Sequence, residues 1–122
     1  MINQLILILL PALCSVESAF NPAAVGDNGK AVGILQIHKE VIIDVNTRCG
    51  RRFKLTDRLD SEKSKTIASL YLCYWGLHYT KKTGKKITLE VLAKIWAGGP
   101  QGWSKKATDE YWEKVKRALK EL

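Results

Sequence analysis

A lone carboxylate stands at the end of the most apolar stretch of this sequence. None of the sixteen residues before Glu17 is charged, and Asn21-Pro22 and the turn sequence Gly26-Asp27-Asn28-Gly29 follow it. A carboxyl at the end of an apolar helix is partly desolvated, which disfavours the charged form and raises its pKa. Such a group can donate its proton to a leaving oxygen, as in glycoside cleavage. Taken alone, Glu17 also fits an ordinary, partly exposed glutamate near a helix end.

A second group of candidate residues follows in the segment Gly33-Ile34-Leu35-Gln36-Ile37. Gly33 has no Cβ, so its backbone can approach a sugar ring closely, although it fits a plain turn equally well. The Gln36 amide offers both a donor and an acceptor, which suits an N-acetyl group or a hydroxyl, or simply the end of an element. Ser18, beside the acid, can hydrogen-bond within the same site.

Two further motifs complete a series. Ala93-Lys94-Ile95-Trp96-Ala97-Gly98-Gly99-Pro100 is followed by Thr108, Tyr111 and Lys114-Val115. In this order and spacing, the motifs resemble the catalytic core of the goose-type lysozyme and soluble lytic transglycosylase family. There a helix ends in Glu-Ser, and an Asn-Pro turn and a Gly-(Leu/Ile)-x-Gln-(Ile/Val) segment follow. An Ala-x-x-(Tyr/His)-Asn-(Ala/Gly)-Gly-Pro segment and a Thr…Tyr…Lys-Val helix come later. The resemblance covers residues from about Leu9 to Leu119.

This resemblance implies a lysozyme-like fold and cleavage of the β-1,4 bond between N-acetylmuramic acid and N-acetylglucosamine in peptidoglycan. It implies Glu17 as general acid and base, without a metal or other cofactor. The lytic transglycosylase route, which yields a 1,6-anhydro product, is favoured. A lysozyme route needs an acid to hold water, for which Asp27 is the nearby candidate, although it fits a turn residue better. The expected substrate-binding residues are Ser18, Gly33, Gln36, Tyr74, Trp96 and Gly98.

The sequence departs from the family motif at Ala97, where Asn is usual, and at Trp96, where Tyr or His is common. An alanine side chain can neither position substrate nor hold the loop, whereas Trp96 can stack on a sugar face. The alternative is therefore a catalytically weakened or inactive relative that binds cell-wall glycan. Trp103, in a Gly-Pro-rich loop, is a further candidate for the cleft. Tyr74 fits either a cleft residue or plain core.

The sequence predicts a mainly all-α chain with a small extended patch near residues 31–37. We expect a buried first helix within Met1–Cys14, where Pro11 either begins a helix or kinks a longer one. Asn21–Lys30 has loop composition, and Arg48–Asp60 is a basic connector. Helices are expected at Lys39–Asn46, at Ser61–Lys82, at Leu89–Trp96 after a Thr88 cap, and after a Thr108 cap.

The longest predicted helix has an apolar face at helical spacing. This face consists of Ile67, Leu70, Tyr71, Tyr74, Leu77 and His78, and Leu72, Cys73, Trp75 and Tyr79 widen it. We therefore expect this helix to be central and mostly surrounded. His38 and His78 have no spacing typical of a nucleophile partner or metal ligand, so both are expected to be structural or exposed.

Length and charge limit the remaining possibilities. The 122 residues fit a single domain, 1–122, and the net charge of +8 favours an anionic partner. Peptidoglycan is the expected partner. Specific nucleic-acid binding is not expected, because no recognition-helix motif is present. The apolar N-terminal run is too short to span a bilayer. It has no clear cleavable signal sequence, and an export signal is the alternative to a buried first helix. We expect a monomer, or part of a larger delivery assembly, that acts at the cell wall.

Overall fold

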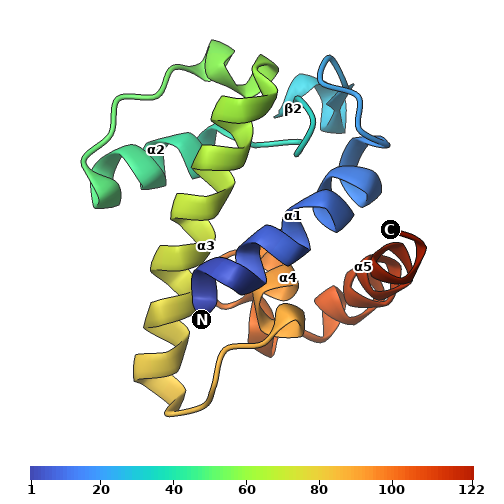
Figure 1. The fold of residues 1–122 in the computed structure, drawn as a ribbon. Helices are drawn as coiled ribbons and strands as arrows, with labels where there is room; N and C mark the ends of the chain where they lie inside the picture. Colours follow the sequence, from blue (N-terminus) through green and yellow to red (C-terminus); the bar gives the residue numbers. More distant parts are fainter. The chain divides into compact units, whose positions relative to one another are not determined.

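The computed structural model describes all residues, 1–122, and is mainly α-helical (Figure 1). The helices are α1 (Ile2–Ser18), α2 (Lys39–Cys49), α3 (Ser61–Thr83), α4 (Leu89–Gly98) and α5 (Asp109–Glu121). A single hairpin joins the two-residue strands β1 (Val25–Gly26) and β2 (Ala31–Val32). The mainly all-α, lysozyme-like class with a small extended patch is thereby confirmed.

The chain divides into two compact units. The first, called here the helical unit, contains Met1–Val16 and Leu72–Leu122, and the second, the hairpin unit, contains Glu17–Tyr71. The chain passes between the units inside α1 and again inside α3. A single domain over residues 1–122 stays a prediction.

The hairpin unit is built around a very short antiparallel ladder. Val25 pairs with Val32, Gly26 pairs with Ala31, and a further bridge joins Val32 to Ile37. A 3-10 turn, Asp27–Gly29, forms the tip, and a second one, Leu55–Leu59, lies between α2 and α3. The buried core side chains of the hairpin unit are those of Ala31, Ile34, Leu35, Ile37, Ile42, Val45, Ile67, Ala68 and Tyr71. This core supports the turn that follows Glu17.

The helical unit packs three helices closely at one glycine. A Cβ on Gly76 of α3 would meet side-chain atoms of Ile2 at 2.7 Å, of Leu92 at 3.1 Å and of Ile87 at 3.4 Å. The side chains of Leu9, Leu13, Leu72, Leu92, Ile95 and Val115 are fully buried. Gly76 therefore allows α1 and α4 to approach α3 within this unit.

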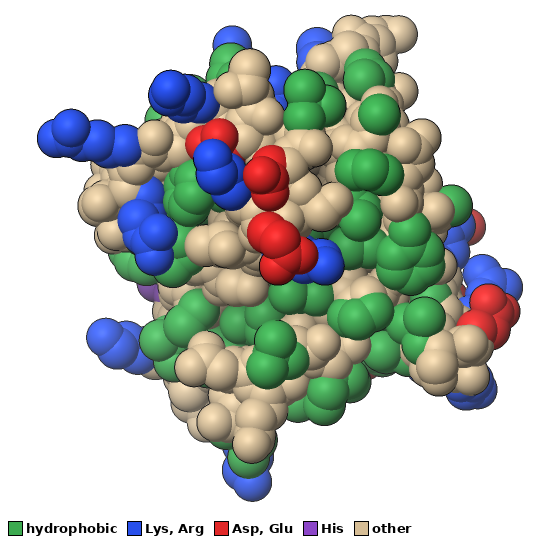
Figure 2. Space-filling model, turned by 45° about the horizontal axis from the view of Figure 1, so that its top comes forward, with side chains coloured by type: hydrophobic (Ala, Val, Ile, Leu, Met, Phe, Trp, Pro, Cys, Tyr) green, Lys and Arg blue, Asp and Glu red, His purple; other side chains and the backbone are tan.

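The first helix is longer than the predicted segment and is only partly buried. α1 continues through Pro11 to Ser18, so Pro11 lies inside a longer helix and does not begin one. Leu7 is 69% exposed and Ile8 is 54% exposed, so the prediction of a buried first helix is wrong for these residues. Exposed apolar side chains are visible as green on the face drawn in Figure 2. None of the helices has the length and apolar character that crossing a membrane requires.

The predicted apolar face of α3 is wrong in its C-terminal half. Tyr74, Leu77 and His78 are exposed, whereas Trp75 and Tyr79 are buried. Aromatic residues occur on both sides of this helix, so the helical period alone fits two faces. The buried one passes through the residues that were expected only to widen it.

The two predicted helix caps behave differently. The Thr88 hydroxyl oxygen accepts a hydrogen bond from the Val91 amide at 3.2 Å, which confirms the cap of α4. Thr108 stands at the N-cap of α5 but makes no such bond. Its buried hydroxyl lies instead 2.9 Å from the Gly102 carbonyl and 2.7 Å from that of Lys105. Thr108 thus holds the preceding loop and does not cap the helix with its side chain.

Candidate active site

Glu17 lies in the last turn of α1 and is the first residue of the hairpin unit, with a half-buried side chain. Ser18, next to it, fixes the following turn. Its hydroxyl donates to the Ile34 carbonyl at 2.7 Å and accepts from the Asn21 amide at 3.1 Å. The Asn21 side chain in turn accepts from the Ala23 amide at 3.0 Å. The acid is therefore followed at once by a turn tied to the Gly33–Ile37 segment.

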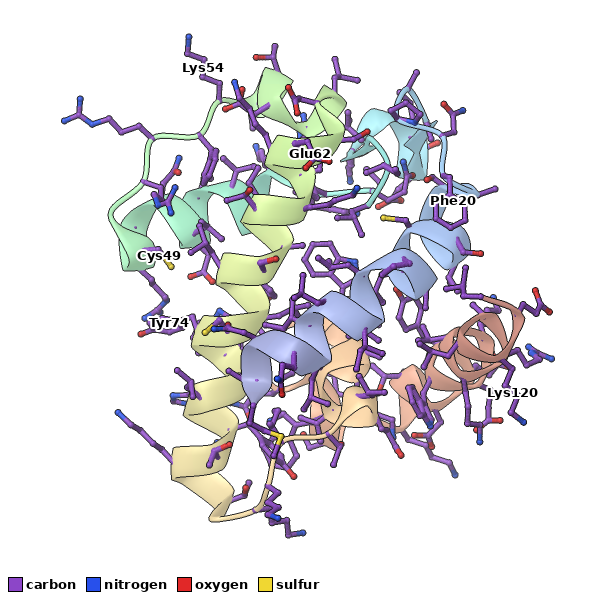
Figure 3. The ribbon with its side chains drawn as sticks, in the orientation of Figure 1. Phe20, Cys49, Lys54, Glu62, Tyr74 and Lys120 are labelled. Atoms are coloured by element: carbon purple, nitrogen blue, oxygen red, sulfur yellow. The ribbon has the colours of Figure 1, made fainter.

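The segment after Glu17 holds an unusual backbone. Ala19, Phe20, Asp27, Asn28 and Gln36 are the non-glycine residues with positive φ, between 50° and 64°, and all lie between residues 19 and 36. Figure 3 shows Phe20 just beyond the end of α1. Such conformations cost about 1–3 kcal/mol each and are concentrated at functional sites. Sequence reasoning missed Ala19 and Phe20, since neither residue type signals a left-handed conformation.

Gly33 and Gln36 make contacts inside the hairpin unit. Gly33 has a φ of +88°, and a Cβ there would run into the carbonyl oxygen of Arg58. The Gln36 amide nitrogen donates to the carbonyl oxygens of Gly33 at 3.0 Å and Ala24 at 3.1 Å. Both residues therefore have a clear role in shaping the turn. Substrate contact by either one stays a prediction.

Asp27, the candidate for holding a water molecule, has a local partner. Its carboxylate lies 3.4 Å from Nε2 of His38, and both side chains are largely exposed. Asp27 occupies the first position of the 3-10 turn at the tip of the hairpin. The predicted turn position is confirmed, and its carboxylate faces an imidazole that pairs with it when protonated.

The other predicted site residues belong to the helical unit. Tyr74 lies on α3, is 37% exposed and contacts Trp75 edge-on, with ring centroids 4.9 Å apart (Figure 3). It is therefore not a core residue. Trp96 is half-buried near the end of α4, and Ala97 beside it is exposed. An asparagine at position 97 would therefore also have an exposed side chain.

Gly98 and the loop after it pack tightly. A Cβ on Gly98 would meet the Thr108 methyl group at 2.7 Å, and the Lys105 ammonium donates to the Gly98 carbonyl at 2.7 Å. Trp103, the further cleft candidate, packs edge-on against the buried Tyr79 at a centroid distance of 5.0 Å. Its indole N–H is buried without a hydrogen-bond partner in the protein. Gly98 thus has a packing role, and its contact with substrate stays a prediction.

Lys94 joins this loop to the next helix. Its ammonium lies 2.7 Å from the Glu90 carboxylate and 2.9 Å from that of Asp109. The hydrogen bond that its ammonium donates to Glu90, then the one that it donates to Asp109, raises the pKa of Lys94 above its usual value of 10.5. The pair ties α4 to the start of α5. The Glu90–Lys94 pair has the i,i+4 spacing of a helix, but the Lys94–Asp109 pair joins residues of two different helices, which no local pattern predicts.

The predicted site residues thus form two groups. Glu17, Ser18, Gly33 and Gln36 lie in the hairpin unit, where Ser18 joins the first pair to the Gly33–Ile37 segment. Tyr74, Trp96 and Gly98 lie in the helical unit. No cluster of three or more His, Cys, Asp or Glu side chains has the arrangement of a metal site.

The comparison with known families settles the affiliation. The model of the Transglycosylase SLT domain matches residues 3–111, which include the helix that carries Glu17 and the loops described above. The chain belongs to this family. The comparison with curated proteins finds no match. Membership in the SLT family supports peptidoglycan as the substrate and lytic cleavage of its glycosidic bonds as the general activity.

Proposed function

We propose that Glu17 is the catalytic acid and base of a peptidoglycan lytic transglycosylase. The substrate bond is the β-1,4 linkage from N-acetylmuramic acid to N-acetylglucosamine. The observation that carries the proposal is the position of Glu17. It is the acid at the end of α1, half-buried and followed directly by the strained turn that Ser18 ties to Ile34.

The position of Glu17 suits a proton donor. Partial burial disfavours a charged carboxylate, and the free carbonyl groups at the C-terminal end of a helix carry partial negative charge. Both effects favour the neutral carboxyl, which can protonate the glycosidic oxygen as the C1–O bond breaks. The N-acetyl group of the muramoyl residue supports the positive centre at C1.

The second step uses the same residue as a base. The Glu17 carboxylate takes the proton of the C6 hydroxyl while O6 bonds to C1, which closes the 1,6-anhydro ring and restores the acid. No water is consumed, so no second carboxylate is required. The alternative hydrolytic route needs an acid that activates water, and the Asp27 carboxylate beside His38 is the candidate for it.

Glu17→Gln tests this proposal. The substitution keeps the size and hydrogen-bonding capacity of the side chain but removes its proton transfer. We expect cleavage of purified peptidoglycan to fall by about 10²–10⁴-fold, the usual contribution of general acid–base catalysis. Mass spectrometry of the soluble products measures both rate and route. Products one water lighter than hydrolysed muropeptides indicate the transglycosylase route. Equal cleavage by both proteins would exclude Glu17 as the acid.

A weakened, glycan-binding relative is the second candidate, because Ala97 replaces the family's usual asparagine. Ala97 is exposed in the last turn of α4, so Ala97→Asn introduces no clash and changes helix propensity by about 0.7 kcal/mol at most. If position 97 limits activity, this variant cleaves peptidoglycan several-fold faster than the native chain. Unchanged or lower cleavage would show that Ala97 is not the limiting departure.

A further inference from the structure

A pocket of about 430 Å³ lies within the hairpin unit, and none of the candidate active-site residues lines it. The lining residues are Gly29, Lys30, Lys39, Glu40, Leu55 and Arg58, and we call it the Arg58 pocket. They come from the tip of the hairpin, the first turn of α2 and the 3-10 turn before α3. Its volume falls within the range of about 300–1,000 Å³ typical of small-ligand sites.

The wall of the Arg58 pocket is positively charged. Lys30, Lys39 and Arg58 contribute three cations against the single carboxylate of Glu40. None of the three cations forms an ion pair with an acidic side chain. The pocket is therefore suited to a ligand with a carboxylate or another small anion.

Arg58 is fixed in place without being neutralised. Its guanidinium donates to the carbonyl oxygens of Leu55 at 2.9 Å, Ile37 at 2.9 Å and Lys30 at 3.2 Å. These three bonds hold the side chain rigid. Because carbonyl groups carry no net charge, the bonds leave the positive charge of Arg58 to act on the pocket. A preorganised charge loses less conformational entropy on binding than a free lysine.

Two other residues narrow the class of ligand. Leu55 is 48% exposed, so an aliphatic segment beside the anion would have an apolar contact. The Glu40 carboxylate disfavours a polymer with an anion in every repeat, but it can accept a hydrogen bond from an ammonium group. Together they favour a carboxylate on a short aliphatic chain that also has an amine. The peptide stem of peptidoglycan is such a ligand.

We propose that the Arg58 pocket binds a carboxylate of the peptide stem, with Lys30 and Lys39 as its ion-pair partners. Leu55 contacts the adjoining aliphatic carbons, and Glu40 accepts from an amino group of the stem. The inference rests on the proposed function, because peptidoglycan is the substrate that presents this peptide. It adds a second point of recognition to the glycan strand.

The test uses an isotope-labelled full chain and a synthetic stem tetrapeptide that has free carboxylates, one side-chain amine and no sugar. In an NMR titration we expect shifts at the amides of Gly29, Lys30, Lys39 and Leu55, and weaker binding as salt is added. The double variant Lys30→Gln/Lys39→Gln should lose about tenfold in affinity, because each exposed ion pair contributes only a few-fold.

A matched control separates the pocket from general charge. Lys85→Gln/Lys86→Gln removes the same two charges from exposed positions outside the pocket and should bind like the native chain. Equal losses in the two double variants, or no shifts at pocket amides, would overturn the proposal. Tighter binding of inorganic phosphate than of the tetrapeptide would also overturn it and assign the pocket to a phosphate-bearing polymer.

Cleavage assays distinguish failure of this inference from failure of the proposed function. The tetrapeptide has no glycosidic bond, so its binding does not depend on Glu17 chemistry. Tetrapeptide binding without cleavage of any peptidoglycan would support the pocket and refute the enzyme. Cleavage with equal kcat/KM on strands with and without peptide stems would refute the pocket and leave the enzyme. A several-fold preference for strands with stems, lost in Lys30→Gln/Lys39→Gln, supports both.

Discussion

In two loops of this chain, a glycine allows the backbone to pass very close to a carbonyl group of another segment. In the hairpin unit, a Cβ on Gly33 would run into the carbonyl oxygen of Arg58. In the helical unit, a Cβ on Gly102 would run into the carbonyl oxygen of Lys94. Only Gly33 also has a positive φ. The close approach is therefore common to both loops, whereas non-glycine residues with a positive φ occur only in the region that follows Glu17.

The cations beside these glycines differ in how their charge is used. The Lys94 ammonium is paired with Glu90 and Asp109 and holds α4 to α5. The Arg58 guanidinium bonds to neutral carbonyl groups and keeps its charge. The helical-unit loop is thus stabilised by neutralised charge, while the hairpin unit keeps positive charge next to a pocket. The charge that is not neutralised in the hairpin unit is the one available to the proposed ligand.

The strongest test of the comparison is Gly33→Ala. It combines a positive φ with a steric overlap, so we expect it to lower the free energy of unfolding by about 3 kcal/mol. Gly29→Ala has a similar φ of +86° but no atom within 4 Å, and should cost about 1 kcal/mol. Gly102→Ala has only the overlap and should cost about 2 kcal/mol.

Chemical denaturation of the three variants checks this relation. If the cost of Gly33→Ala is near the sum of the other two, backbone strain and close approach act independently. If Gly33→Ala costs no more than Gly29→Ala, the backbone at Arg58 moves aside easily. The close approach at Gly33 would then not be equivalent to the one at Gly102.

The charge contrast predicts different pH dependence for Lys94→Met and Arg58→Met. Because the pKa of Lys94 is raised, its stabilisation is complete below pH 10.5 and is lost as pH rises through the folded-state value. We expect Lys94→Met to cost about 1 kcal/mol at neutral pH and progressively less above pH 10.5.

Arg58→Met should cost about 2 kcal/mol because carbonyl groups lose their donors, and this cost should stay constant over the same alkaline range. Unfolding of the native chain and both variants by urea from pH 7 to pH 11 measures the difference. A Lys94→Met cost that does not decrease at high pH would show that its ion pairs contribute nothing to stability.

The smallest expected effect concerns the turn after Glu17. Ala19 has a φ of 52°, a conformation that glycine adopts without strain. We expect Ala19→Gly to change the free energy of unfolding by no more than about 1 kcal/mol, in the stabilising direction. A rise in melting temperature would confirm that strain is stored there, and a fall would show that the methyl group contributes more than the strain costs.

Much of this fold follows from local sequence signals. The Thr88 cap and the turn sequence Gly26-Asp27-Asn28-Gly29 placed element ends correctly within a few residues. These signals act over three or four residues, so no distant partner is needed to interpret them. The acid and the segment that follows it were recognised as motifs for the same reason.

Features that depend on distant partners could not be predicted. The exposure of Leu77 was missed because α3 has aromatic residues on both sides, and the helical period alone did not choose a face. The buried Thr108 hydroxyl turns away from its own helix because carbonyls of the preceding loop are closer. The role of Gly33 against Arg58 joins residues twenty-five positions apart, and nothing local announces it.

The passage of the chain between its two units has a consequence for protein engineering. Both crossings, at Val16–Glu17 and at Tyr71–Leu72, lie inside helices and not in loops. A fragment cut at these points would begin at Glu17 and place a new charged amine beside its carboxylate. Exchange of modules between relatives is therefore better attempted at the loop joining α3 to α4, which leaves the helix bearing the acid intact.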